Sequence, residues 1–175
     1  TLQHTTFTQN KASYGGGLGL VINTQSNTVN ILDCEFTKNI STLFVGAYYS
    51  MGGAIGVTHQ PNTNGTGNTV LIENCLIKDN ETANNGGGVG VLNESGANNT
   101  LIIRNCEVFD NLALKSGGGV AIITPHHDYT ARIERTHFKN NDSPHGAGLL
   151  ISRWNGSPLS AKHDMSLISC LFSDH

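Results

Sequence analysis

Charged residues are scarce in this chain. The 175 residues include 10 Lys and Arg and 13 Asp and Glu, which gives a formal net charge of −3. A chain without a basic surplus lacks the electrostatic footprint of nucleic-acid binding or of attachment to an anionic membrane. No apolar run approaches the ~20 residues that cross a bilayer as a helix. The composition therefore predicts no nucleic-acid partner and no membrane insertion by this segment.

Sequence patterns for the common cofactor sites are missing as well. The four cysteines (Cys34, Cys75, Cys106 and Cys170) include no Cys-x-x-Cys pair of the kind that binds zinc. Glycine is abundant, at 21 residues, but it does not recur at every third position as in collagen. The glycine-rich stretches are not followed by a helical pattern, which argues against a phosphate-binding loop. We therefore predict no metal and no cofactor.

What the chain does contain is a phrase that returns about every 30 residues. An aromatic or aliphatic residue is followed by two residues and an Asn, then by a short gap and a group of glycines with alternating aliphatics. The Asn residues of the five copies are Asn10, Asn39, Asn80, Asn111 and Asn141. Self-similarity at this period is typical of a solenoid.

A further segment precedes each copy and alternates between apolar and other residues, as in Val29-x-Ile31. Such alternation predicts strands with one buried face. One extra residue then interrupts the alternation, and it is Asp33, Asn74 or Asn105 in three of the copies. These residue types tolerate the left-handed backbone of a tight bend. We predict an all-β fold, a right-handed single-stranded parallel β-helix of about five coils with three short strands per coil.

Both ends of the chain fall inside a repeat. We therefore interpret residues 1–175 as a single β-helix segment and expect it to be an excerpt from a longer repeat protein. Its first partners are then the neighbouring coils of that longer chain.

Two columns of equivalent residues follow from the alignment of the copies. The five Asn residues of the repeated phrase predict a structural ladder, because stacked amides can donate and accept hydrogen bonds along the axis. The four cysteines also share one position, which predicts a buried column of thiols that behave as small hydrophobes. A Cys34–Cys75 or Cys75–Cys106 disulfide is the minor alternative, since parallel side chains disfavour the required torsion.

Asn-x-Ser/Thr sequons occur at seven positions, three of which (Asn39, Asn80 and Asn141) belong to the predicted ladder. The other four fall in the variable loops and are candidate glycosylation sites if the protein passes through a eukaryotic secretory pathway: Asn64, Asn93, Asn98 and Asn155. They favour an extracellular or cell-surface location.

The combined Phe-x-x-Asn and Gly-Gly-Ala-Ile motifs resemble the repeats of the chlamydial polymorphic membrane proteins. The first motif is present at residues 7–10, 36–39 and 138–141, and the second at residues 52–55. Similar repeats occur in large surface proteins of other organisms, including eukaryotes. The resemblance covers nearly the whole chain and implies a pectin-lyase-like β-helix that displays surfaces for adhesion.

Loops are where the copies differ, and two sets of them carry candidate ligand-binding residues. The insertion of residues 40–51 brings apolar and aromatic side chains, and it either forms an exposed contact patch or folds back over its own coil. Polar loops that include His59 form the second set, and they either converge on one edge or stay apart. The candidates are Phe44, Tyr48 and Tyr49 in the insertion, and His126, His127, Asp128, Trp154 and His163 in the polar loops.

The outward positions of the glycine-containing strand are nearly all small. Gly19, Gly56, Gly90 and Ala121 are among them. This pattern predicts a flat, bare sheet face that could accept another domain or an extended ligand.

Three classes of function fit this architecture. The favoured one is an extracellular binding or adhesion module whose partner is a cell-surface glycan or a protein. A structural stalk or self-associating spacer is the alternative. A carbohydrate-active lyase or hydrolase has less support, because Glu35 and Glu107 share an outward column with Leu76 between them. No catalytic residue is assigned, since a glycoside hydrolase needs two carboxylates that face one cleft.

Overall fold

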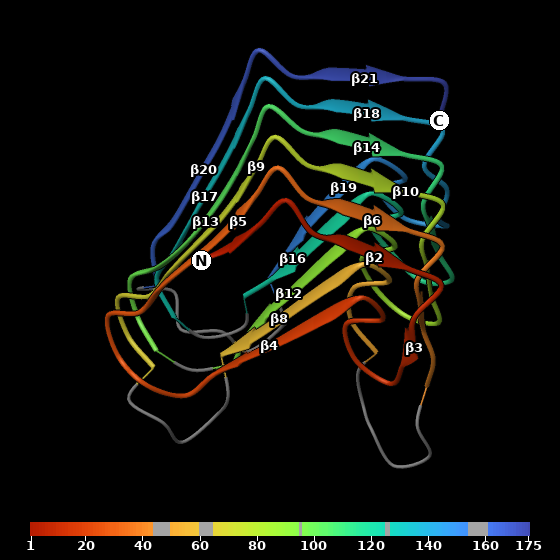
Figure 1. The fold of residues 1–175 in the computed structure, drawn as a ribbon. Helices are drawn as coiled ribbons and strands as arrows, with labels where there is room; N and C mark the ends of the chain where they lie inside the picture. Colours follow the sequence, from red (N-terminus) through yellow and green to blue (C-terminus); the bar gives the residue numbers. More distant parts are fainter. Residues whose placement is uncertain (44–49, 60–64, 95, 125–126, 154–160) are drawn as a thin grey trace.

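The computed structural model shows a solenoid of stacked coils, with the N-terminal and C-terminal coils at opposite ends of the stack (Figure 1). It describes residues 1–43, 50–59, 65–94, 96–124, 127–153 and 161–175. Within these ranges the regular structure consists of strands alone. The same ranges contain no helix of the length and apolarity that a membrane span requires.

The strands form four parallel sheets, here named A to D in the order in which the chain first visits them. Sheet A contains β1 (Leu2–Gln3), β5 (Thr28–Leu32), β9 (Thr69–Glu73), β13 (Asn99–Arg104), β17 (Tyr129–Glu134) and β20 (His163–Ile168). Sheet B contains β2 (Thr6–Thr8), β6 (Glu35–Thr37), β10 (Leu76–Lys78), β14 (Glu107–Phe109), β18 (His137–Lys139) and β21 (Leu171–Ser173).

The other two sheets complete each coil. Sheet C contains only two-residue strands, β3 (Lys11–Ala12), β7 (Ile40–Ser41), β11 (Glu81–Thr82) and β15 (Leu112–Ala113). Sheet D contains β4 (Leu18–Ile22), β8 (Ile55–His59), β12 (Val89–Asn93), β16 (Val120–Ile123) and β19 (Leu149–Ser152). We name the four turns of a coil the A–B, B–C, C–D and D–A corners.

The predicted fold class is confirmed: the chain is a right-handed parallel β-helix of about five coils. Sheets A, B and D are the three predicted strands of each coil. The strands of sheet C were not predicted. They are too short to show an alternating pattern in the sequence, because a two-residue strand contains a single inward position.

A continuous apolar core fills the space between the sheets. Each coil contributes inward side chains at the same positions, so that like residues stack on like. The rings of Phe7 and Phe36 are parallel with centroids 4.8 Å apart, and those of Phe138 and Phe172 lie 4.6 Å apart. Ile31, Ile72, Ile103 and Ile133 form a second buried column from sheet A. This stacking is why the aromatic and aliphatic positions recur in the sequence.

The A–B corner has the predicted left-handed bend. Asp33, Asn74 and Asn105 have φ angles of 52°, 54° and 53°. Their side chains also pair, since the Asn74 Nδ2 donates to Asp33 Oδ1 at 3.0 Å. Arg135 holds the same bend in a later coil at a φ of 44°, although an Arg lacks the short polar side chain that favours this conformation.

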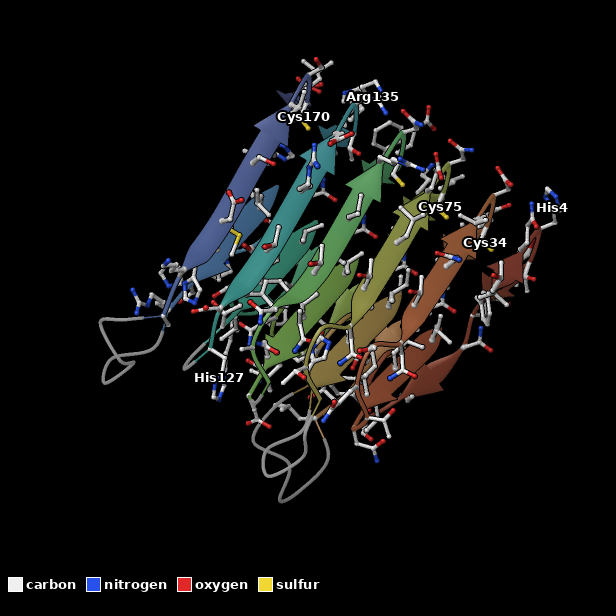
Figure 2. All side chains as sticks on the ribbon, turned by 90° about the vertical axis from the view of Figure 1, so that its left-hand side faces the viewer. His4, Cys34, Cys75, His127, Arg135 and Cys170 are labelled. Carbon is white, nitrogen blue, oxygen red and sulfur yellow. The ribbon has the colours of Figure 1, made fainter. Side chains whose placement is uncertain are left out.

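The cysteine column lies just after this bend, as predicted. Cys34, Cys75 and Cys106 are buried, Cys170 is half-buried, and all four are free thiols. Figure 2 shows Cys34, Cys75 and Cys170 beyond the ends of the sheet A strands, in a row along the stack. The Cys75 backbone N–H lies 3.5 Å from the Sγ of Cys106.

The prediction of a bare face on sheet D is wrong for the middle coils. Gly56, Gly90 and Ala121 are buried on that face. A glycine with positive φ begins each pass of the chain into sheet D, at positions 15, 52, 86, 117 and 146. The residue before it then lies against the outer side of the sheet, where Met51 packs with Leu92 and Ile123. Small residues are therefore required there because the chain covers its own strand.

Candidate functional site: the D–A corner

The predicted Asn positions form a hydrogen-bonded ladder at the B–C corner. In Asn10, Asn39, Asn80 and Asn111, the backbone N–H and the Nδ2 both donate to Oδ1 of the Asn in the next coil, at 2.9–3.1 Å. Each Nδ2 from Asn39 onward also donates to a backbone carbonyl of the preceding coil. Asn39, Asn80, Asn111 and Asn141 are buried. Their amides are fully engaged inside the fold, which gives them a structural role.

A second ladder at the D–A corner was missed in the sequence. Asn27 donates through its backbone N–H and its Nδ2 to Oδ1 of Asn68, and Asn68 does the same to Asn99, at 2.9–3.1 Å. The signal was present as Asn-Thr-x-x-Ile at residues 27–31, 68–72 and 99–103. The pattern was hard to see because a variable loop directly precedes each of these Asn residues. The loops differ in length, so the spacing between the Asn residues changes from copy to copy.

This second ladder stops after Asn99. Tyr129 and then His163 occupy the same register position in the two following coils. His163 Nε2 lies 3.1 Å from the carbonyl oxygen of His127 and 3.3 Å from Oγ1 of Thr124. Asp128 Oδ1 accepts a hydrogen bond from the Lys162 backbone N–H. Polar residues of two successive coils thus meet where the ladder ends.

Three of the predicted ligand-binding residues are brought together in this way. His127, Asp128 and His163 lie at the D–A corner, and each of them is half-buried. Figure 2 shows His127 at the start of the sheet A strands, at the end opposite to the cysteines. His126 and Trp154 lie outside the described residues.

His59 does not belong to this surface cluster, and its prediction as a polar loop residue is wrong. It is the last residue of β8, it points into the solenoid and it is fully buried. In the part of the chain that the structure describes, neither of its ring nitrogens has a hydrogen-bond partner. Burial lowers the pKa of His59 to about 4, because the cation would lose its hydration. Its imidazole is therefore neutral at physiological pH.

The insertion in the second coil begins and ends at residues that contact each other. Ser41 and Ser50 are both buried, and their Oγ atoms are 2.8 Å apart. Ser50 Oγ also lies 3.0 Å from Thr82 Oγ1 of the next coil. Leu43 is 52% exposed at the start of the insertion. Phe44, Tyr48 and Tyr49 lie outside the described residues, so the two interpretations of their role remain predictions.

Of the four candidate glycosylation sites, the structure describes two. Asn98 is exposed at a turn with a φ of 60°. Asn93 is buried, so its prediction as a surface acceptor is wrong: its Oδ1 accepts from Asn99 Nδ2, and its own amide donates to the Gly96 carbonyl. It continues the inward alternation of β12 to the last residue of that strand. Asn64 and Asn155 lie outside the described residues.

The acidic residues keep the arrangement expected from the alignment. In sheet B, Glu35 and Glu107 both pair with Leu76, which lies between them. The part of the chain that the structure describes contains no group of three His, Cys, Asp or Glu side chains placed to hold a metal ion.

Comparison with known proteins finds no matching family model, no matching curated protein and no matching solved structure. The interpretation of this chain therefore depends on its own residues and geometry.

Proposed function

We propose that this β-helix is an extracellular binding or adhesion module that presents its ligand-binding residues at the D–A corner. The observation that carries the proposal is the meeting of His127, Asp128 and His163 from two successive coils at one corner. The B–C corner, in contrast, repeats the same Asn contact in every coil. A rigid scaffold with variable polar loops on one side is a common arrangement for binding.

The chemistry of this corner suits a polar ligand. Asp128 supplies a carboxylate, His127 and His163 supply imidazoles, and Lys162 adds an exposed ammonium group. Such groups hydrogen-bond the hydroxyls of a glycan or the polar side chains of a protein. We infer that the partner is a cell-surface glycan or protein.

The stalk or self-associating spacer is the second candidate. It is favoured by the regularity of the first ladder and of the stacked core, which need no ligand to explain them. The carbohydrate-active enzyme has less support, because two strand spacings of ~4.8 Å each separate Glu35 from Glu107 along their shared column.

A binding experiment with matched variants separates these functions. The wild-type chain is screened on a glycan array and on cell surfaces, together with a double variant, Asp128→Ala with His163→Ala. The control is Asp33→Ala with His4→Ala, which changes an Asp and a His with a 4.0 Å separation at the other end of sheet A. Binding that is lost in the first double variant and kept in the control supports the proposal.

A third variant tests the insertion. Deleting residues 43–49 gives the second coil the five residues between its ladder Asn and its glycines that the third coil has. The register supports this junction, because Ser41 pairs with Thr82 and Met51 with Asn85. Binding lost only in this variant would move the site to the insertion. A folded wild type that binds nothing would leave the stalk as the function.

A further inference from the structure

The interior beneath the D–A corner contains polar atoms that have no partner among the described residues. His59 is 0% exposed and Tyr129 is 1% exposed. Within those residues, neither Nδ1 nor Nε2 of His59, nor the Tyr129 hydroxyl, forms a hydrogen bond. The two rings meet edge to face, with centroids 6.2 Å apart and an interplanar angle of 69°. Buried polar groups are normally bonded, so three unbonded atoms in one contact require an explanation.

Neighbouring residues do not compensate for this arrangement. In the register of sheet D, Ile22 lies on one side of His59 and Asn93 on the other. Ile22 has no polar atom in its side chain, and the Asn93 amide is engaged with Asn99 and Gly96. The imidazole is thus held in the core by packing alone.

The ionisable groups around the imidazole are few. In the described ranges, Tyr129 on β17 meets the imidazole ring to ring. Glu94, directly after β12, contacts His59 through its backbone N–H, which donates to the His59 carbonyl at 3.1 Å. Tyr14, before β4, interacts electrostatically with Tyr129 and Glu94. None of these three described side chains hydrogen-bonds a ring nitrogen of His59. An imidazolium ion at this place would therefore have no acceptor, and it would have to reach water to be stabilised.

The position of the contact in the chain decides what would move. His59 is the last residue of β8, and Tyr129 is the first residue of β17, directly after Asp128 of the candidate site. We propose that the His59–Tyr129 contact is an acid-opened latch: protonation of His59 drives it out of the core and opens the D–A corner, while the rest of the solenoid stays folded. The opening itself does not depend on the proposed function. Only its consequence, the release of a ligand bound at the D–A corner, rests on that function.

The rest of the molecule explains why the opening stays local. The first ladder is built from Asn amides, which do not titrate. Its donors and acceptors cross every coil boundary from Asn10 to Asn141 at the B–C corner. Acid therefore removes support from one corner of the coil and leaves the other intact.

Hydrogen–deuterium exchange at pH 7.4 and pH 4.5, corrected for the intrinsic exchange rates, tests this latch without any ligand. We expect at least a tenfold loss of protection in peptides that cover residues 55–59 and 127–134. Peptides that cover the ladder residues 80–82 and 111–113 should keep their protection. The His59→Leu variant should lose the pH effect, and the exposed control His4→Leu should retain it.

A direct readout keeps the test valid if His59→Leu fails to fold. In the wild type, the ring nitrogens of His59 should show the NMR shifts of a neutral imidazole at pH 5.5, and protonation should coincide with the exchange of the Tyr129 amide. Equal protection at both pH values, the same opening in a folded His59→Leu variant, or simultaneous loss of all sheets would overturn the latch. Because no ligand is present, failure of the latch is separate from failure of binding at neutral pH.

Discussion

The B–C and D–A corners of this solenoid both begin with an asparagine ladder, and they end differently. At the B–C corner, five Asn residues from Asn10 to Asn141 repeat one pattern of hydrogen bonds. At the D–A corner the pattern holds for Asn27, Asn68 and Asn99 only. The two corners show that a repeat can be kept for structure on one side and varied on the other.

The two corners differ in the residue types that occupy the ladder position. An interior Asn at the B–C corner bonds backbone groups of the preceding coil and the side chain of the ladder Asn in the next coil, so each copy constrains the next. Where the D–A ladder ends, Tyr129 and His163 take over the position, and the loops beside them bring polar side chains to the surface. Regularity thus indicates the scaffold, and the place where it stops indicates the candidate site.

The largest expected effect comes from breaking the regular corner. Asn80→Ala removes an Oδ1 that accepts two hydrogen bonds and an Nδ2 that donates to Phe36, Lys78 and Asn111. We expect a loss of about 4 kcal/mol in the free energy of unfolding, because each buried partner left unbonded costs ~1–3 kcal/mol. Urea denaturation measures this loss. Asn10→Ala, at an exposed end of the ladder, should cost less than about 1 kcal/mol, and equal losses would contradict the comparison.

The next largest effect is the pH dependence of stability that arises from His59 at the D–A corner. An unfolded His59 binds a proton as the pH falls through its usual pKa near 6.5, whereas the folded one resists until about pH 4. The contribution of neutral His59 to the free energy of unfolding is therefore complete above pH 6.5 and is lost as the pH falls to about 4. The total loss is at most about 3 kcal/mol. The measurement is the difference in stability between wild type and His59→Leu across this range. A constant difference would show that His59 is hydrated in the folded state.

A smaller effect is expected when alanine replaces either of two glycines that differ in the space around them. A Cβ at Gly90 would lie 2.4 Å from the Gly52 nitrogen and 2.9 Å from the Asn85 carbonyl oxygen, both of them backbone atoms. We expect Gly90→Ala to cost about 2 kcal/mol, since the backbone must shift. At the D–A corner a Cβ on Gly67 meets only the Ser26 Oγ at 3.8 Å, so Gly67→Ala should cost about 1 kcal/mol, owing to its φ of 67°. Thermal unfolding of both variants checks this order.

The smallest effect is a stabilisation at the A–B corner. Arg135 adopts a left-handed conformation that Asn favours, and an Asn at this place would match Asn105 in the preceding coil. We expect Arg135→Asn to raise the stability by about 0.5 kcal/mol, because the exposed contacts of Arg135 with Glu134 and Asn105 contribute little. A lower melting temperature in this variant would show that these contacts outweigh the backbone preference.

Much of the fold could be predicted because its determinants are local and periodic. The Phe and Ile columns alternate within each strand, and Asp33, Asn74 and Asn105 mark the bend by residue type. The bare face on sheet D was predicted wrongly because a small residue next to solvent and a small residue under a covering chain look alike in a sequence. Only the positive φ angles at glycines such as Gly52 and Gly86 reveal how the chain turns back over its own strand.

The candidate site was predictable as a set of residue types but not as an arrangement. His127, Asp128 and His163 were named from their loops, yet their proximity depends on loops of different length that return to the same register. His59 shows the opposite case, since a histidine before a loop is usually polar surface and here it is core. Its inward direction follows from the alternation of β8 continuing for one more residue.

The sequence by itself determined the coil: its period, its inward positions, its first ladder and its thiol column, because each of these is a contact between equivalent residues one repeat apart. Tertiary structure alone decided the covered face of sheet D, the burial of His59 against Tyr129 and the meeting of polar loops at the D–A corner. Those contacts join residues that are not equivalent in the repeat, so no period in the sequence encodes them. They depend on the turns at the corners, where the direction of the chain is set by a few dihedral angles.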